Sequence, residues 1–457
     1  MALAHKKSIS QRLLSGSVWS FSARISTALA GFLVNALLAR LLAPEELGVY
    51  FLAFSVVTFL ALLAQLGLKQ AVVRLVAESL AKEDYGHAKK VIAVTFSIIT
   101  AGVFIVGLFY FFVAGQFVST RIFESTLLLS VTGITVFWVA TLAYQTILAE
   151  TFRGLHDIRY ASLFGGFCTS FLSMIFFALL WIIKGDSNIK EVMTLAVCAG
   201  AGSGFIAASL LGSKISKYDA SQAKTASGVS VDLLLHLYFS GLVVFLMQGG
   251  HLWILGAYRP EDEVAIYGAA YRIVNLVAMP LLIINNVIPP MISDLYCRGD
   301  KKRVRRVLQS TASFAGIPSI IILTIFIMFG KDILGIVFGD FYREAYSVLV
   351  ILTVGKIVNV FTGSPSVLLV MSGNQRLSFY SSLISGFISL FISYCFVEAY
   401  GSEGVAAGLS LGLVMHNVIM WLACIYKVGI PTHMSISKTV ISDIRTSFLS
   451  TMNRGLK

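Results

Sequence analysis

The 457-residue sequence is 57% apolar and only 13% charged. Its mean hydropathy of +0.84 lies far above the values of chains that bury their apolar side chains in one water-soluble core. The composition excludes a soluble enzyme or a soluble binding module and predicts an all-α integral membrane protein. The net charge of +12 is compatible with a nucleic-acid partner. The positions of the charges along the chain decide whether they indicate such a partner or the topology of a membrane protein.

Apolar stretches long enough to cross a bilayer recur along the chain. A spanning helix needs about 20 mostly apolar residues, because each residue rises about 1.5 Å and the hydrocarbon is roughly 30 Å thick. Twelve spans are predicted, at residues 17–42, 47–67, 91–115, 126–149, 160–183, 190–212, 232–256, 264–289, 306–330, 345–371, 378–400 and 402–427. The first is too long for a signal-peptide core, so it is predicted to be a retained helix.

Basic residues are unevenly distributed over the predicted loops. Of 35 Lys and Arg residues, 25 lie in the N-terminal tail, in alternate loops and from residue 427 onward, whereas 7 lie in the opposite loops. By the positive-inside rule this distribution predicts an even number of spans with both termini cytoplasmic, as in a multi-pass protein of the cell (inner) membrane. The positive charge therefore indicates topology, and no nucleic-acid partner is expected.

The two halves of the chain resemble each other. RLLAPEELGVY, which ends at Tyr50, is matched by YRPEDEVAIY, which ends at Tyr267. The first tyrosine precedes Asp84 by 34 residues and the second precedes Asp300 by 33, and each aspartate opens a basic segment. A spacing that is kept in both halves predicts parallel repeats related by an axis along the membrane normal.

This repeat predicts the division of the chain. The predicted parts are an N-terminal six-helix lobe at 1–213, a cytoplasmic linker at 214–231, a C-terminal six-helix lobe at 232–427 and a cytoplasmic tail at 428–457. In the tail, apolar residues at helical spacing from 432 to 452 predict an amphipathic helix on the membrane surface. Prolines lie within or beside spans only in the second lobe, which predicts that helices eight to ten are irregular.

The motifs resemble the multidrug/oligosaccharidyl-lipid/polysaccharide exporter superfamily, and within it the polysaccharide transporter branch of O-antigen and exopolysaccharide flippases. The residues that carry the resemblance are RLLAPEELGVY at 40–50, LGLKQAVVRLVAE at 66–78, IYGAAYRIVNL at 266–276, and Pro289 and Pro290. The resemblance implies about twelve transmembrane helices in two six-helix lobes that form a V-shaped central cavity. Many relatives have an Asp at the outer end of the seventh helix, where this chain has His251.

The implied activity is transport of an undecaprenyl-diphosphate-linked oligosaccharide from the cytoplasmic to the outer leaflet by alternating access, for surface polysaccharide synthesis. The implied partners are this polyprenyl-diphosphate-linked oligosaccharide, the lipid bilayer and polysaccharide polymerase machinery. No cofactor and no catalytic residue is expected. The five cysteines have no metal-ligand spacing, and GAGSG at 200–204 lies inside an apolar span, where close helix packing explains it better than nucleotide binding.

Three basic residues lie within predicted spans, namely Arg24, Arg272 and Lys356. No acidic residue lies within a span, although a charge at a helix centre costs at least about 2.5 to 3.5 kcal/mol on insertion scales. These cations therefore need water or an anionic guest, and the forked donors of arginine suit phosphate oxygens. For Arg24, snorkelling to the nearby helix end is the alternative, whereas Arg272 and Lys356 are expected to face the cavity.

Asn275 joins these three as a predicted substrate-binding residue, because it follows Arg272 by three positions on the same helix face. Other amides within the spans, among them Gln145, Asn285, Asn359 and Asn417, are predicted to form hydrogen bonds between helices. Arg24 and Arg272 lie on the first and eighth helices, where related flippases place cavity arginines.

Three other functions remain open. A lipid II flippase usually has fourteen spans, so twelve favour the polysaccharide branch. A cation-coupled multidrug exporter of the same superfamily would need a carboxylate within the membrane, and the predicted spans contain none. A membrane-bound polymerase or glycosyltransferase would need a large outer loop for its catalytic groups, and the predicted outer loops are short.

Overall fold

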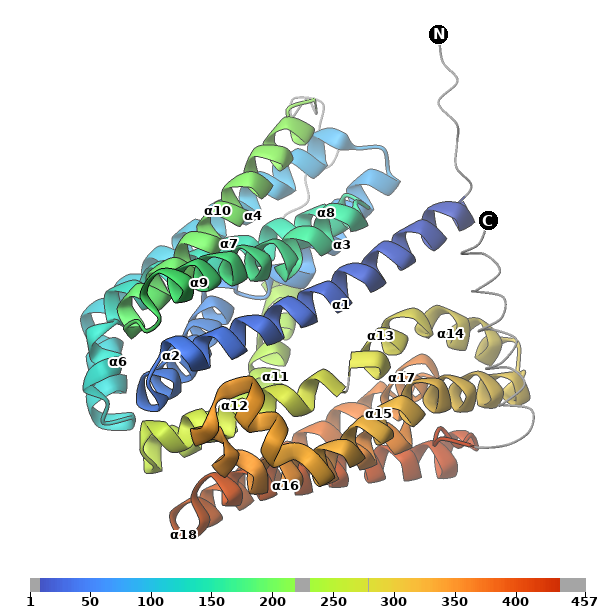
Figure 1. The fold of residues 1–457 in the computed structure, drawn as a ribbon. Helices are drawn as coiled ribbons and strands as arrows, with labels where there is room; N and C mark the ends of the chain where they lie inside the picture. Colours follow the sequence, from blue (N-terminus) through green and yellow to red (C-terminus); the bar gives the residue numbers. More distant parts are fainter. Residues whose placement is uncertain (1–8, 218–230, 278, 436–457) are drawn as a thin grey trace. The chain divides into compact units, whose positions relative to one another are not determined.

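A computed structural model describes residues 9–217, 231–277 and 279–435, and these residues contain helices and turns but no strand (Figure 1). In the first part of the chain the helices are α1 (Ile9–Leu41), α2 (Pro44–Gln65), α3 (Leu68–Ala81), α4 (Tyr85–Phe109), η1 (Tyr110–Ala114), α5 (Gly115–Phe117), η2 (Val118–Ile122), α6 (Thr126–Ser130), α7 (Thr132–Gly154), α8 (Ile158–Ser162), η3 (Leu163–Phe167), α9 (Cys168–Lys184) and α10 (Ile189–Ile215). From residue 231 onward they are α11 (Val231–Tyr258), α12 (Glu261–Val277), α13 (Met279–Val287), α14 (Pro289–Cys297), α15 (Lys301–Phe338), η5 (Asp340–Ala345), α16 (Tyr346–Thr362), α17 (Pro365–Met371), α18 (Gln375–Ala423) and η6 (Cys424–Val428).

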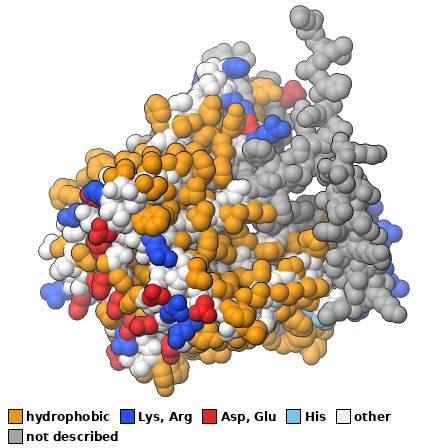
Figure 2. All heavy atoms as spheres, viewed as in Figure 1, with side chains coloured by type: hydrophobic (Ala, Val, Ile, Leu, Met, Phe, Trp, Pro, Cys, Tyr) orange, Lys and Arg blue, Asp and Glu red, His pale blue; other side chains and the backbone are white. Residues whose placement is uncertain are grey.

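The prediction of an all-α membrane protein is confirmed. Within the described residues, nine helical segments are long and apolar enough to cross a membrane, and Ile25–Leu41 is a shorter apolar helix. Large apolar side chains such as Phe112, Ile183 and Phe205 are 70% or more exposed, and Figure 2 shows hydrophobic side chains over much of the visible surface. Such a surface requires lipid as its solvent. The count of twelve spans stays a prediction. The last two predicted spans, for example, belong to one helix in the structure, α18.

By packing, the chain divides into two compact units, Met1–Ala265 and Ile266–Lys457. In the first unit α7 is the central helix and packs against α2, α3, α4 and α10 (Figure 1). Its residues Ile147 and Phe152 have no exposed surface. In the second unit α16 packs against both α15 and α18.

Helix α11 packs with the first unit. The Trp253 indole N–H donates to the Ser55 hydroxyl of α2 at 2.7 Å, and the Phe59 ring meets the indole edge to face at 5.1 Å. From the sequence, α11 is expected to open the second lobe at residue 232. The lobe boundaries therefore stay a prediction, and most of the predicted linker lies outside the described residues.

The same turn occurs twice in each unit and supports the internal repeat. In each turn a residue with positive φ precedes an Asp or Asn, and the pairs are Glu83 with Asp84, His156 with Asp157, Gly299 with Asp300, and Gly373 with Asn374. At each turn two backbone N–H groups donate to carbonyls of the preceding helix, which is the Schellman arrangement. The second turn follows the first by 73 residues in the first unit and by 74 in the second.

The aspartates of these turns also begin the next helix. Asp84 accepts a hydrogen bond from the His87 N–H at 2.9 Å, and Asp300 accepts one from the Arg303 N–H at 3.0 Å. A side chain that caps the first turn satisfies a backbone donor that has no partner inside the helix. The two aspartates identified by their spacing in the sequence therefore have the same structural role.

Several predicted spans are interrupted. The eighth has a break near its end at Ile288, between α13 and α14, and the tenth is broken at Gly363 (φ +73) between α16 and α17. The ninth was also predicted to be irregular, but α15 continues through Pro318 without a break. In the first unit, the helix that contains α8 and α9 has non-helical angles at Gly165 and Gly166. Glycine as well as proline therefore marks the interruptions.

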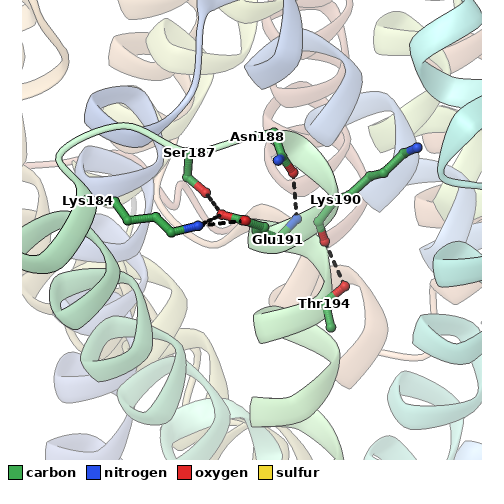
Figure 3. A network of polar contacts seen from close by, with 6 residues as sticks. All are labelled: Lys184, Ser187, Asn188, Lys190, Glu191 and Thr194. Atoms are coloured by element: carbon green, nitrogen blue, oxygen red, sulfur yellow. Dashed lines mark hydrogen bonds and ion pairs between the residues drawn. The ribbon is translucent and has the colours of Figure 1, made fainter.

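Each unit contains a helical hairpin, and the two hairpins are closed differently. In the first unit, α9 and α10 are joined by a turn in which Lys184 pairs with Glu191 at 2.7 Å and Asn188 caps α10 (Figure 3). In the second unit the chain reverses at Gly401 inside α18, where φ is +52° and ψ is −131°. Beyond this reversal, a Cβ at Gly408 would lie 2.2 Å from the Ser393 hydroxyl.

The close packing predicted for GAGSG is not found at Gly204, where a Cβ would have no neighbour within 4 Å. At Gly200 a Cβ would make only an ordinary contact of 3.4 Å with Thr141. Close helix approach through glycine occurs at Gly102 of α4, against Ala64 of α2, and in α18 at Gly404, Gly408 and Gly412.

The described part of the predicted tail does not form a surface helix. Residues 429–435 are not helical, and Thr432 has no exposed surface. The prediction of a helix from residue 432 is wrong for 432–435. The Thr432 hydroxyl and the Met434 N–H donate to backbone carbonyls of α16, so these residues do not form the hydrogen bonds of a new helix. The rest of the predicted tail, 436–457, lies outside the described residues.

Candidate substrate-binding site

Arg272 and Asn275 lie on one face of α12, as their spacing predicts. Both side chains are partly buried, and the Arg272 guanidinium donates to the Gly268 carbonyl at 3.5 Å. Asn275 is hydrogen-bonded to the hydroxyl of Tyr271. The Tyr271 ring is in turn stacked on Tyr267, with ring centres 6.0 Å apart and an angle of 9° between the planes. This face of α12 therefore combines one cation, one amide and two aromatic rings.

The role of the two tyrosines is not identified from the sequence. The signal is present in YGAAYR, where Tyr267 and Tyr271 are four residues apart and directly precede Arg272. Residues at this spacing are neighbours on a helix, so the stacked pair follows from the helix itself. Tyr267 is 3% exposed, so Tyr271 is the ring of the pair that can present an apolar face beside a hydroxyl, which suits the mixed surface of a sugar ring.

Lys356 lies on α16 in the second unit. This helix packs against α15 and α18. The Lys356 side chain is partly buried, and the residues one turn to either side on the same face, Leu352 and Val360, are buried. Lys356 forms no hydrogen bond or ion pair with any described residue, so neither Arg272 nor Asn275 is its partner. An ammonium group without a protein partner in a spanning helix is a candidate for stabilisation by water or by an anion.

Arg24 lies within α1, in the first unit, and its side chain is outside the described part of the structure. Thr27, one turn further along the same helix, lies against the helix break of η3, where a Cβ on Gly166 would be 3.4 Å from the threonine methyl. The cavity position of Arg24 therefore stays a prediction. The structure brings together Arg272 and Asn275 among the four predicted residues.

Four of the amides expected to join helices do so, namely Gln145, Asn285, Asn359 and Asn417, whereas Asn35 donates to the Gly31 carbonyl of its own helix. Gln145 of α7 donates to Thr169 of α9 and, at 3.5 Å, to the Phe164 carbonyl beside the break at Gly165. Asn359 of α16 donates to Asn417 of α18 at 3.0 Å. Asn285 accepts from Ser364 next to the break between α16 and α17. These bonds provide partners for polar groups that would otherwise be exposed to lipid.

His251, where many relatives have Asp, is buried on α11 with 1% of its surface exposed. The described residues contain no cluster of three or more His, Cys, Asp or Glu that could hold a metal ion. The spans present guanidinium, ammonium, amide, hydroxyl and aromatic groups, and α7 also holds the buried carboxylate of Glu150, which pairs with Arg153 at 2.7 Å. The donors and ring faces of this set suit anions and sugars.

Comparison with protein families gives two matches. A family described as Polysaccharide biosynthesis protein matches residues 13–296, which is more than half of the chain. A second family, MatE, matches residues 237–395. Among curated proteins, the chain is 23% identical over 169 residues to the probable low-salt glycan biosynthesis flippase Agl15 of Haloferax volcanii. The match covers 36% of this chain and spans about a third (35%) of the length of that relative.

Solved structures of multidrug-transporter folds cover nearly the whole chain. An inward-facing multidrug resistance MATE family transporter of the MOP superfamily is 15% identical with a TM-score of 0.71, and the match covers 90% of this chain and 98% of that one. A MOP superfamily transporter from Pyrococcus furiosus, described by a reversed polarity of its binding pocket, is 14% identical with a TM-score of 0.63 and coverages of 92% and 96%. At these identities the similarity concerns the fold alone.

Proposed function

The chain belongs to the polysaccharide biosynthesis protein family, and from this premise we propose that it is a flippase for a lipid-linked oligosaccharide. The substrate would be an undecaprenyl-diphosphate-linked oligosaccharide, moved from the cytoplasmic to the outer leaflet by alternating access. The proposal places the protein in the cell membrane, with both termini cytoplasmic, as a transporter that forms no covalent intermediate. The product would supply surface polysaccharide synthesis, including its polymerase machinery.

The observation that carries this proposal is Lys356. It is a partly buried cation on a spanning helix, and it has no ion pair with any described residue. A diphosphate is a suitable guest for such a group, because it brings the missing negative charge. Arg272 with Asn275 would bind the same headgroup through forked donors, and Tyr271, which is stacked on the buried Tyr267, would contact the sugar.

The main alternative is a cation-coupled multidrug exporter, favoured by the MatE match and by the fold of the solved MATE transporters. The polarity of the pocket varies within this fold, as the Pyrococcus furiosus protein is described to show. A cationic drug would be repelled by Arg24, Arg272 and Lys356. A lipid II flippase is a further alternative with the same headgroup chemistry.

Alanine at Arg24 or Arg272 is expected to abolish flipping while membrane insertion persists. Lysine at Arg272 is expected to keep partial activity, because it retains the charge but loses the two-pronged donor. The assay measures outer-leaflet polymer and accumulated lipid-linked precursor in a strain that lacks its own flippase. Arg298→Ala is the matched control, since this arginine is 71% exposed and pairs with Asp294 on the surface.

Export by both alanine variants at the wild-type rate, without precursor accumulation, would contradict the cavity role of the arginines. Efflux of a cationic dye from vesicles, unaffected by these substitutions, would favour the drug-exporter alternative. The two assays together separate the two functions.

A further inference from the structure

Residues 429–435 form a strap that lies inside the second unit. The π-helical turn η6 ends at Gly429 (φ +75), and the chain then turns back against the helices that precede it. Ile430 is 1% exposed and belongs to a hydrophobic cluster with Leu308 of α15 and Leu368 of α17. Non-helical backbone is tolerated within a membrane protein where it is buried in protein and its polar groups have partners.

The strap supplies partners for the end of α16. The last carbonyls of a helix have no acceptor role inside the helix. Here the Met434 N–H donates to the Phe361 carbonyl at 2.9 Å, and the Thr432 hydroxyl donates to the Thr362 carbonyl at 2.8 Å. Gly363 follows with φ +73, and a Cβ there would lie 2.7 Å from the Thr432 carbonyl.

The strap is also attached to α15. The Ser313 hydroxyl lies 3.0 Å from both the N–H and the carbonyl of Ser435, so it can accept from one and donate to the other. The Met434 side chain occupies the space over Gly316, where a Cβ would lie 2.3 Å from the sulfur. Side chain and backbone of the strap therefore both fit positions on α15.

His433 links the strap to two aromatic side chains. Its ring stacks on Phe361 of α16, with centres 6.0 Å apart and 22° between the planes. It also meets the Trp421 ring of α18 edge to face, and the indole N–H donates to His433 Nδ1 at 3.1 Å. Because Nδ1 accepts this bond, the imidazole has to be neutral in the docked strap.

Protonation of His433 would remove this acceptor. The charged group that acts on the ring is Arg305 of α15, whereas α16 and α18 contribute the uncharged Phe361 and Trp421. Burial and the Arg305 charge both hold the pKa of His433 below its ordinary value of 6.5. The neutral form is therefore favoured in the docked state, and docking weakens as the pH falls through 6.5.

We propose that the strap is a pH-sensitive latch that positions the end of α16, with His433 as the group that senses pH. This inference rests on the proposed function, because α16 carries Lys356. Lys356 lies six residues before Thr362, or about 9 Å along the helix. Asn359, between them, holds α16 to Asn417 of α18. Release of the strap removes two hydrogen bonds from this helix end and slows transport.

Two measurements test the latch in the full-length protein in lipid nanodiscs or proteoliposomes. The first follows Trp421 emission from pH 8 to pH 5.5, taken as the difference between the wild type and Trp421→Phe. Protonation of His433 ends its hydrogen bond to the indole and its edge-to-face contact, so this emission should change on acidification, and His433→Gln should abolish the change. The second measures flipping of a fluorescent undecaprenyl-diphosphate-linked N-acetylglucosamine over the same range.

Flipping by the wild type should fall by roughly threefold between pH 7.5 and pH 5.5. His433→Gln should remove this dependence, because glutamine offers an acceptor that does not titrate. A disulfide between Ser313→Cys and Ser435→Cys, with the five native cysteines replaced by serine, should also keep flipping independent of pH. Thr432→Val should lower flipping at all pH values.

A Trp421 emission that does not change with pH would overturn the latch, whatever the flipping assay shows. An unchanged pH dependence of flipping in His433→Gln would do the same. A wild type that titrates at Trp421 but flips no lipid-linked sugar at any pH would overturn the proposed function and leave the latch as a device for another cargo.

Discussion

Two helical hairpins, one in each unit, show how differently glycine is used in one fold. In the first unit, α9 and α10 are joined by a polar turn with an ion pair, and Gly204 of α10 faces open space. In the second unit the reversal is at Gly401 alone, and Gly408 lies against the Ser393 backbone and hydroxyl. Glycine-rich sequence in a span therefore predicts close packing only where a small partner faces it.

Helix breaks differ between the units as well. In the first unit, the break at Gly165 is bridged by the Gln145 side chain of a neighbouring helix. In the second unit, the break at Gly363 is bridged by the strap of residues 429–435. A side-chain bond, from Ser364 to Asn285, also lies at this second break. The strap is the partner that the proposed latch would release.

The largest effect is expected at Gly408. Leucine there would collide with Ser393, whose hydroxyl and amide nitrogen would lie 2.2 and 2.7 Å from the new Cβ. We expect the hairpin of α18 to separate, with about 3 kcal/mol or more of destabilisation. Yield of folded protein in membranes and its thermal stability in detergent measure this. Gly204→Leu, the matched change in the first unit, should leave both unchanged, and equal losses in the two variants would refute the comparison.

A smaller effect is expected when Gln145 is replaced by leucine. The Phe164 carbonyl beside the break would lose its bond to this side chain, at a cost of about 1 to 2 kcal/mol. Thermal unfolding of the purified protein measures the loss. Asn35→Leu is the control, since Asn35 donates within its own helix to the Gly31 carbonyl at 2.6 Å. If both variants unfold at the same temperature as the wild type, the break does not depend on Gln145.

The smallest effect concerns the repeated turns. Glu83 and His156 adopt positive φ in the first unit, at 54° and 57°, where the second unit has Gly299 and Gly373. Glycine adopts this conformation without the steric cost of a Cβ, so Glu83→Gly is expected to stabilise the first unit by about 0.5 to 1 kcal/mol. Gly299→Ala should destabilise the second unit by a similar amount. Opposite shifts in the unfolding temperature support the equivalence of the turns, and shifts of the same sign contradict it.

Much of the fold follows from the sequence because lipid imposes simple rules. Apolar length predicts the spanning helices, and the spacing of Asp84 and Asp300 identifies two equivalent helix caps. The breaks are less predictable, since Pro318 interrupts nothing while Gly165 and Gly166 do. Whether a residue breaks a helix depends on which neighbour satisfies the freed carbonyl, and that neighbour is distant in the sequence.

The candidate site is predicted only in part for the same reason. Arg272 and Asn275 are adjacent because helix geometry alone joins them, and the tyrosines beside them follow the same rule. The strap cannot be predicted in this way. The apolar spacing from residue 432 fits a helix, but the partners that hold Thr432 extended are the carbonyls of α16, some 70 residues away. Local periodicity carries no information about such contacts.

The four matched turns also have a use in protein engineering. Each one joins two helices through a turn with a positive φ, and the turns recur at nearly equal intervals, 73 residues in the first unit and 74 in the second. A segment cut at Asp84 and Asp157 has the same ends as one cut at Asp300 and Asn374. These positions therefore mark natural crossover points, at which segments from related transporters can be exchanged so that each chimera keeps a native junction at both ends.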